Sequence, residues 1–252
     1  INFYYSPTEY IKDENIKYFL KKTNDIIDKN LENLEFNSTQ TYKRHKNELN
    51  CKRHKTIFNN HDAIPEYCFG CYKIQIEPDN VIDLIKLHIL FDNIKLKNNN
   101  LRKCMIEFRA NIPGKYKGLI YCDSLKESEF IQNQLIKLMD QNFNKKLLCK
   151  IKRGCTEFGM KYPKYDNLTS DAMIYKKEWK IYENSVDEKN PELLSKRIIK
   201  PSIKGTSLND ILIIRNWLAY ARMIGDSSHK DISDKIFNSD FISKKLKLRI
   251  NK

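Results

Sequence analysis

Apolar and polar residues alternate over several short segments in the middle of the chain. Segment 71–78, CYKIQIEP, places Tyr72, Ile74 and Ile76 on one side and polar residues on the other. The same alternation is found in residues 102–109, 116–124 and 147–154. A period of two residues is typical of a strand with one buried face, so these four segments predict four strands.

Two longer segments between these strands have apolar residues at helical spacing. They cover residues 81–94 and 125–143, and Ser124 with Glu127 forms a capping box before the second. The predicted order is therefore strand, helix, strand, strand, helix, strand, which is the order of ferredoxin-like folds. We predict an α+β protein with a ferredoxin-like βαββαβ core over residues 72–163.

Cysteine and histidine residues cluster just before the first predicted strand. Cys51, His54, Cys68 and Cys71 form the pattern C-x2-H-x13-C-x2-C. Structural zinc takes four nitrogen or sulfur ligands that arrive as two short-range pairs, and Gly70 gives the second pair backbone freedom. We expect these four side chains to bind a structural Zn2+ that orders a polar segment with few core residues.

Other interpretations of this pattern stay open. His61 or His45 could replace His54 as the fourth ligand, and three nearby cysteines also suit an iron–sulfur cluster. The two later thiols could instead be ordinary core residues at the start of a strand. Cys155 follows the last predicted strand, and the sequence gives it no partner.

The segments that flank the core have helical periodicity. Residues 15–34, 173–188 and 207–225 are the clearest predicted helices. The chain then divides into an N-terminal helical segment (1–50), a metal knuckle (51–71), the ferredoxin-like domain (72–163) and a C-terminal helical extension (164–252).

The net charge of the chain is +14, which favours anionic partners such as nucleic acid. Lysine far outnumbers arginine, and asparagine and isoleucine are abundant, so a compositional bias can explain part of this charge. No apolar run is long enough to span a membrane, and no membrane insertion is expected. The seven cysteines, an odd number, favour a reducing compartment, and we expect the cytoplasm.

Basic residues concentrate in residues 43–55, 145–164 and 244–252, and aromatic residues interleave with the second stretch. Proteins that bind single-stranded nucleic acid place lysines along phosphates and stack rings on bases. We expect nucleic-acid contacts from Lys43, Arg44, Lys52, Arg53, Lys73, Tyr121, Lys150, Lys152, Arg153, Phe158 and Tyr162. Alternatively, these basic stretches could be ordinary solvent-exposed surface, because the chain is rich in lysine throughout.

The strand alternation also predicts one sheet face that no helix covers. RNA-recognition modules stack bases on rings from the first and third strands of such a face. Segment 115–121, KYKGLIY, has a basic–glycine–aromatic order, although only Tyr121 supplies a ring. Glu77 and Glu107 are carboxylates on the same face that could serve metal-dependent chemistry, but two strand spacings put them about 10 Å apart.

No phosphate-binding loop, zinc-protease, deaminase or serine-hydrolase motif occurs in the sequence. We therefore predict a non-enzymatic, zinc-stabilised basic protein that binds nucleic acid, RNA in preference to DNA, and that could act with protein partners in a ribonucleoprotein. One alternative is a metal-dependent nuclease or transferase that uses the open-face carboxylates. Another is a protein–protein interaction module whose basic charge is incidental.

Overall fold

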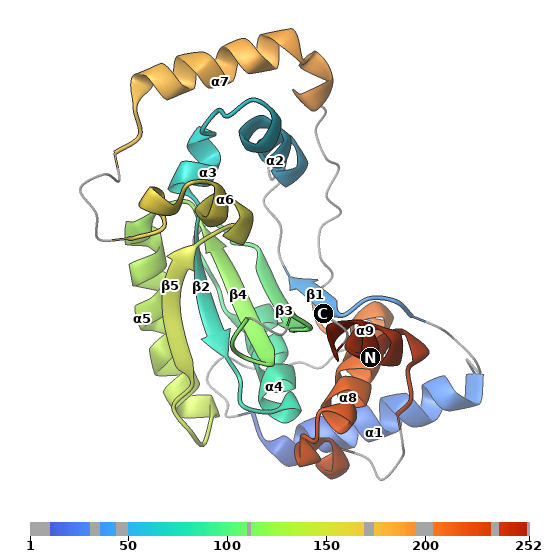
Figure 1. Ribbon diagram of the computed structural model, residues 1–252. Helices are drawn as coiled ribbons and strands as arrows, with labels where there is room; N and C mark the ends of the chain where they lie inside the picture. The colour runs from blue at the N-terminus through green and yellow to red at the C-terminus, as the bar shows by residue number, and fades with distance from the viewer. Residues whose placement is uncertain are drawn as a thin grey trace.

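The protein is α+β, and its structure is a computed structural model that describes residues 11–30, 36–43, 50–109, 112–168, 174–194, 204–232 and 237–250. This part of the chain forms a five-stranded antiparallel sheet and nine α-helices (Figure 1). In chain order the elements are α1 (Asp13–Asn30), β1 (Gln40–Lys43), α2 (Cys51–Asn60), α3 (Glu66–Gly70), β2 (Tyr72–Glu77), α4 (Val81–Asn93), β3 (Arg102–Ile106), β4 (Tyr116–Cys122), α5 (Leu125–Asn142), β5 (Leu148–Arg153), α6 (Thr156–Lys161), α7 (Lys177–Lys189), α8 (Leu208–Met223) and α9 (Asp240–Ile250).

The strands lie across the sheet in the order β1-β3-β4-β2-β5, and every neighbouring pair is antiparallel. The predicted strands and the two helices between them are confirmed as β2 to β5, α4 and α5. The sequence pattern does not predict β1, which adds an edge to the sheet and places Tyr42 opposite Lys103. Four residues among polar neighbours are too few to show a clear alternation.

Helices α4 and α5 pack on one face of the sheet and bury its apolar side chains. Ile74 and Ile76 of β2 are fully buried, and each contributes about 1.5–3 kcal/mol. Gly118 of β4 lets α4 approach closely, because a Cβ atom at this position would lie 2.2 Å from Leu87 Cδ2. The main hydrophobic core of the protein therefore lies between this face and the helices.

Two groups of helices lie at opposite ends of the sheet (Figure 1). The lower group contains α1, α8 and α9, and the side chain of Trp217 in α8 is fully buried there. The upper group contains α2, α3, α6 and α7, and we call it the cap. The cap has an apolar cluster of its own, rich in aromatic rings and separate from the main core; its buried members are Phe58, Ile64, Cys68, Phe69, Phe158 and Tyr165.

The predicted flanking helices are confirmed as α1, α7 and α8. Helix α8 begins with the predicted capping box, in which Ser207 and Asp210 bond reciprocally, and Gly225 after its end has a φ of +79°. Residues 51–71, predicted as a metal knuckle, contain α2 and α3, and no zinc knuckle is present among the described residues. Within the same residues, no helix is long and apolar enough to cross a membrane.

Candidate nucleic-acid interface

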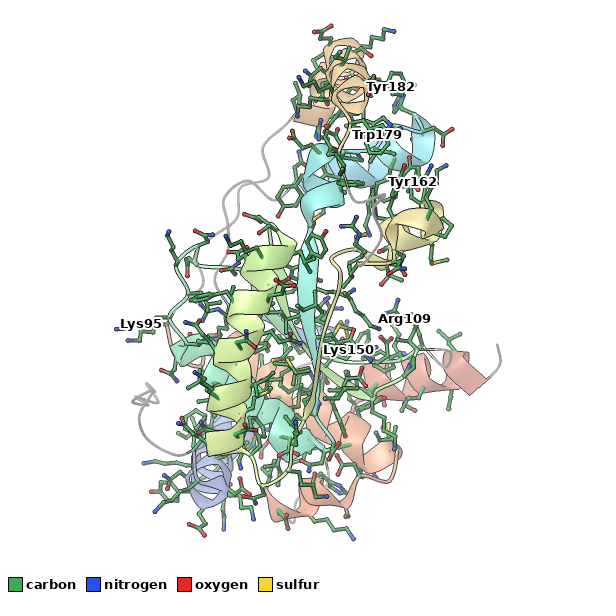
Figure 2. All side chains as sticks on the ribbon, turned by 90° about the vertical axis from the view of Figure 1, so that its left-hand side faces the viewer. Lys95, Arg109, Lys150, Tyr162, Trp179 and Tyr182 are labelled. Atoms are coloured by element: carbon green, nitrogen blue, oxygen red, sulfur yellow. The ribbon has the colours of Figure 1, made fainter. Side chains whose placement is uncertain are left out.

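The sheet face opposite α4 and α5, which we call the open face, points outward between α6 and α9 (Figure 2). The side chains of Arg109 and Lys150 lie on this side of the molecule, whereas Lys95 lies on the other. Strand alternation puts the side chains of both predicted carboxylates and all predicted open-face lysines here. The polar side of the sheet is therefore where the sequence predicts it.

The strand register brings lysine and tyrosine side chains together near the cap end of the open face. Lys103 of β3 lies opposite Tyr42 of the edge strand β1. In the next row of the same face, Lys73 lies between Tyr121 on one side and Lys152 on the other. We call these five residues the lysine–tyrosine cluster.

Lys73 and Lys103 are embedded in this cluster without an acidic partner. The side chain of Lys73 is only 8% exposed, and Lys103 is half-buried. Among the described residues, no carboxylate lies within ion-pair distance of either ammonium group. The Nζ atom of Lys103 lies 5.7 Å from the centre of the Tyr42 ring instead.

The two ammonium groups disfavour each other as well as being poorly hydrated. Burial, to which the charge of Lys73 adds, lowers the pKa of Lys103 to about 8. Burial also lowers the pKa of Lys73, and the neighbouring Lys152 adds to the effect. Placing positive charge here costs stability, and an anion bound between the lysines would offset that cost.

The carboxylates of the open face are already bound by basic side chains. Glu107 accepts from Lys117 at 2.9 Å and from Arg109 at 2.7 Å. Burial opposes the charge of Glu107, but these hydrogen bonds outweigh it and lower its pKa to about 2. Glu77 pairs with Lys150 at 2.7 Å. Neither carboxylate is therefore positioned to bind a metal ion as it stands.

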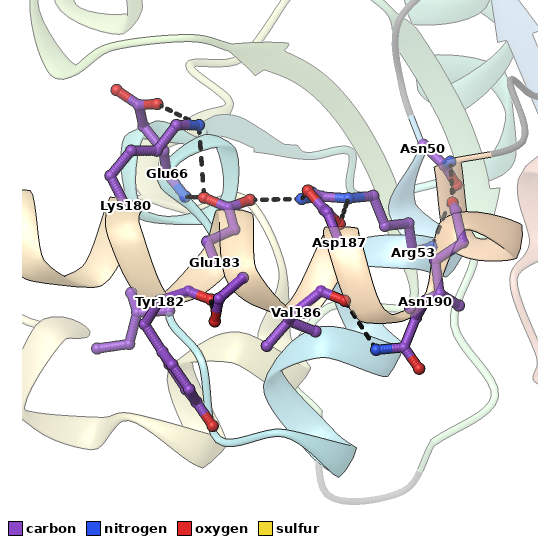
Figure 3. Close-up of polar contacts among 12 residues, drawn as sticks. Asn50, Arg53, Glu66, Lys180, Tyr182, Glu183, Val186, Asp187 and Asn190 are labelled. Atoms are coloured by element: carbon purple, nitrogen blue, oxygen red, sulfur yellow. Dashed lines mark hydrogen bonds and ion pairs between the residues drawn. The ribbon is translucent and has the colours of Figure 1, made fainter.

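Three of the basic residues expected at the interface lie in contacts inside the protein. Lys43 is buried and pairs with Asp210 at 2.8 Å. Arg53 in α2 donates to Glu183 and to Asp187 of α7, both at 2.9 Å, and so joins α7 to the rest of the cap (Figure 3). Arg153, the third of these residues, is buried as well.

Arg153 lies at the end of β5 inside the aromatic cluster of the cap. Its guanidinium donates to the carbonyl of Tyr165 at 2.6 Å, and it lies over the rings of Phe69 and Tyr72. Phe158 is buried beside it, and Tyr162 donates to the carbonyl of Ala63 at 3.3 Å. These residues form a packed interior rather than a stacking platform.

The remaining predicted contacts differ in exposure. Lys52 on α2 and Lys152 on β5 are exposed, and Lys150 is partly exposed beside Glu77. Tyr121 is partly exposed on the open face. Arg44 lies outside the described residues, as does His45, one of the alternative metal ligands.

The four predicted zinc ligands lie near one another in sequence but do not form a metal site in the structure. His54 is buried and stacks on Tyr67, with ring centres 5.0 Å apart. Cys68 and Cys71 are buried, whereas Cys51 is exposed at the first residue of α2. No group of three or more His, Cys, Asp or Glu side chains that could hold a metal occurs in the described ranges. His61, the other alternative, is partly exposed at the end of α2.

Sequence reasoning missed two members of the lysine–tyrosine cluster. Tyr42, which is 42% exposed, could not be assigned to the open face because β1 was not predicted. Lys103 lies in a predicted strand. It is two residues from Met105 and four from Glu107, so its side chain lies on the same open face. The segment QTYK carries no apolar–polar alternation that indicates an edge strand, because Thr41 and Lys43, which the structure buries, are polar residues.

Comparisons of the chain with protein-family models, curated proteins and solved structures found no match. The function proposed below therefore rests on the geometry and charge of the open face.

Proposed function

We propose that this protein binds single-stranded nucleic acid, RNA in preference to DNA, through the open face of its sheet, and that it does so without catalysis. The observation that carries the proposal is the pair Lys73, which is buried, and Lys103, which is half-buried; both lie on the sheet face that α4 and α5 do not cover and have no acidic partner among the described residues. A phosphate group between these two ammonium groups would satisfy both charges. Lys152 extends the basic surface toward the exposed edge strand β5.

The tyrosines of the cluster favour a single strand over a duplex. Tyr42 and Tyr121 lie near the two lysines, one on the edge strand and one in the centre of the sheet. Unpaired bases can stack on such rings, and each stacked base contributes about 1–3 kcal/mol. Bases inside a duplex are already stacked on each other, so they would not use these rings.

We also propose that β2, α4, β3, β4, α5 and β5 form a ferredoxin-like domain within residues 72–163, with β1 as an added edge strand. The supporting observation is the antiparallel strand order β3-β4-β2-β5 with both helices on one face. This arrangement places neither helix on the opposite face, which is the face that RNA-recognition modules use to bind RNA. Fold alone does not assign a function, so the proposal depends on the lysines and tyrosines.

The test is the binding of a fluorescein-labelled single-stranded RNA of mixed sequence, measured by fluorescence anisotropy over a series of KCl concentrations. We expect the affinity to fall with salt, with a slope of log K against log [KCl] of about −0.7 for each phosphate contact. The double variant Lys73→Met/Lys103→Met should bind more weakly, and its slope should be shallower by about 1.4.

The matched control is Lys95→Met, which removes one exposed lysine from the other side of the molecule. It should bind RNA as the unaltered protein does. Equal affinity and equal salt slope in the double variant and the control would contradict the proposed site. A duplex RNA of the same length should bind more weakly than the single strand.

A further inference from the structure

Four cysteines that are scattered along the sequence converge where the cap meets the sheet. Cys68 lies in α3 and Cys71 just after it, and the N–H of Cys71 donates to the carbonyl of Cys68 at 3.3 Å. The end of β5 lies against this turn, because the N–H of Gly154 donates to the carbonyl of Cys71 at 3.0 Å. A Cβ atom at Gly154 would lie 2.2 Å from the sulfur of Cys71, so the backbone next to Cys155 touches this thiol.

Helix α2 brings the fourth cysteine to the same place. The thiol of Cys155 donates to Glu157 at 3.0 Å, and Glu157 pairs with Lys55 at 2.6 Å. Lys55 follows Cys51 by four residues on α2, so the two side chains lie on one face of that helix. Cys51 therefore lies on the side of α2 that faces Cys155.

Electrostatic contacts agree with this placement. Burial, to which the thiols of Cys51 and Cys155 add, raises the pKa of Cys71 to about 12. Burial also raises the pKa of Cys68, and the same two thiols and Cys71 add to the effect. Each buried thiol thus has the other three within electrostatic reach.

His54 is buried on α2 and makes a ring contact. Its ring stacks on Tyr67, and after burial, which lowers its pKa to about 4, the charges that act on it come from Arg53 and from α7. The groups on α7 are Glu183, Asp187 and Lys180. The ring of His54 is engaged in this stacking, whereas the backbone next to Cys155 touches the thiol of Cys71, so Cys155 is preferred to this imidazole as the fourth ligand.

We propose that Cys51, Cys68, Cys71 and Cys155 together bind one structural Zn2+, in the pattern C-x16-C-x2-C-x83-C. The thiols as placed do not yet form a metal group, so binding would draw them together. Cys51 is exposed at a helix end and can turn inward, and Cys155 can leave Glu157, which keeps its pair with Lys55. Each cysteine would release its proton to solvent on binding the ion.

The surroundings suit the charge of such a site. Zinc with four thiolates carries a net charge of −2, and both Lys73 and Arg153 lie close enough to favour a thiolate at Cys71. Four sulfur ligands form a closed site that stabilises structure and leaves no position for a substrate. The ion would tie α2 and the start of α6 to β2, and so fix the cap on the sheet.

The test uses the full-length chain, purified with reduced thiols. Zinc content per chain is measured by elemental mass spectrometry, and cobalt(II) is then exchanged into the metal-free protein. The near-ultraviolet charge-transfer absorption of cobalt increases with the number of thiolate ligands, so the unaltered protein reports the ligand set without any substitution. We expect one zinc per chain and the absorption of four thiolates.

Three variants identify the ligands. Cys155→Ser should lose the metal or show one thiolate fewer, whereas His54→Gln should keep the four-thiolate absorption. Cys149→Ser, which removes a half-buried thiol on β5 outside the group, is the matched control and should bind as the unaltered protein does. Absence of bound metal, or an absorption of three thiolates that changes in His54→Gln but not in Cys155→Ser, would overturn the proposal.

Discussion

Two basic residues on each face of the sheet, Lys43 and Arg102 on one and Lys73 and Lys103 on the other, are held in different ways. On the helix-covered face, Lys43 pairs with Asp210 at 2.8 Å. Arg102, also buried there, donates to main-chain carbonyls of α4 and the residue after it, including Ile94 at 2.6 Å. Each charge on this face has acceptors that the fold itself supplies.

On the open face, Lys73 and Lys103 lie on β2 and β3, with β4 between them, and have no such acceptors among the described residues. A buried charge without a partner costs free energy, and such features persist where a ligand uses them. We therefore propose that Lys43 stabilises the fold, whereas Lys73 and Lys103 bind a ligand. The same Lys→Met substitution on the two faces should therefore change stability in opposite directions.

The largest effect is expected at the covered face. Lys43→Met removes one partner of a buried ion pair and leaves Asp210 uncompensated, which should lower the free energy of unfolding by about 3–5 kcal/mol. Urea unfolding followed by circular dichroism measures this change. Lys95→Met, on an exposed turn, should stay within about 0.5 kcal/mol of the unaltered protein. Unchanged stability in Lys43→Met would remove the contrast between the faces.

The next effect concerns base stacking on the edge strand. Tyr42→Ala should weaken RNA binding by about 1–3 kcal/mol, because a stacking ring is lost, while the fold of this exposed position is kept. Anisotropy titration at constant salt measures the loss. Tyr42→Phe keeps the ring and should bind nearly as the unaltered protein does. A similar loss in both variants would assign the effect to the hydroxyl, which donates to Gln40 at 2.6 Å.

A smaller effect of opposite sign is expected at Lys103. Lys103→Met removes a poorly hydrated charge from the open face, so the free energy of unfolding should rise by about 1 kcal/mol while RNA affinity falls. Urea unfolding and anisotropy on the same preparation measure the two changes. A variant that is less stable than the unaltered protein would show that Lys103 supports the fold.

The smallest effect is a pH dependence. In the folded protein the pKa of Lys103 is about 8, whereas in the unfolded chain it is near its ordinary 10.5. The unfolded state therefore binds more protons between these values, so this group favours folding increasingly as pH rises through that window. The stability difference between Lys103→Met and the unaltered protein should shrink from pH 7 to pH 10, and RNA affinity should fall above pH 8. Urea unfolding and anisotropy at a series of pH values check both.

The sequence predicts the sheet well because its information is local. Strand alternation and caps such as Ser124 act over a few residues, and they are confirmed. The partners of Lys43 and Arg53 lie more than a hundred residues away, so no local pattern shows that these cations are paired. For the same reason, segment 145–164 suggests a stacking surface, although Phe158 and Arg153 pack inside the cap.

Local spacing has the same limit for the thiols. Cys51 and His54 are neighbours in sequence, but the imidazole is buried and stacks on Tyr67, whereas Cys51 is exposed. Cys155 has no partner in the sequence pattern, because only the packing of β5 on the turn before β2 brings it to Cys71. Cysteines on separate elements can be grouped into a proposed metal site only after the strand order is known.

Ultraviolet crosslinking is the most direct test of whether nucleic acid lies on the open face of the sheet. Single-stranded RNA bound to the full chain is irradiated with ultraviolet light, and the crosslinked peptides are identified by mass spectrometry. We expect crosslinks in the peptides that contain Tyr42 and Tyr121, and we expect the variant Lys73→Met/Lys103→Met to lose them. Crosslinks confined to α5 or to the turn around Lys95, on the other side of the sheet, would contradict it.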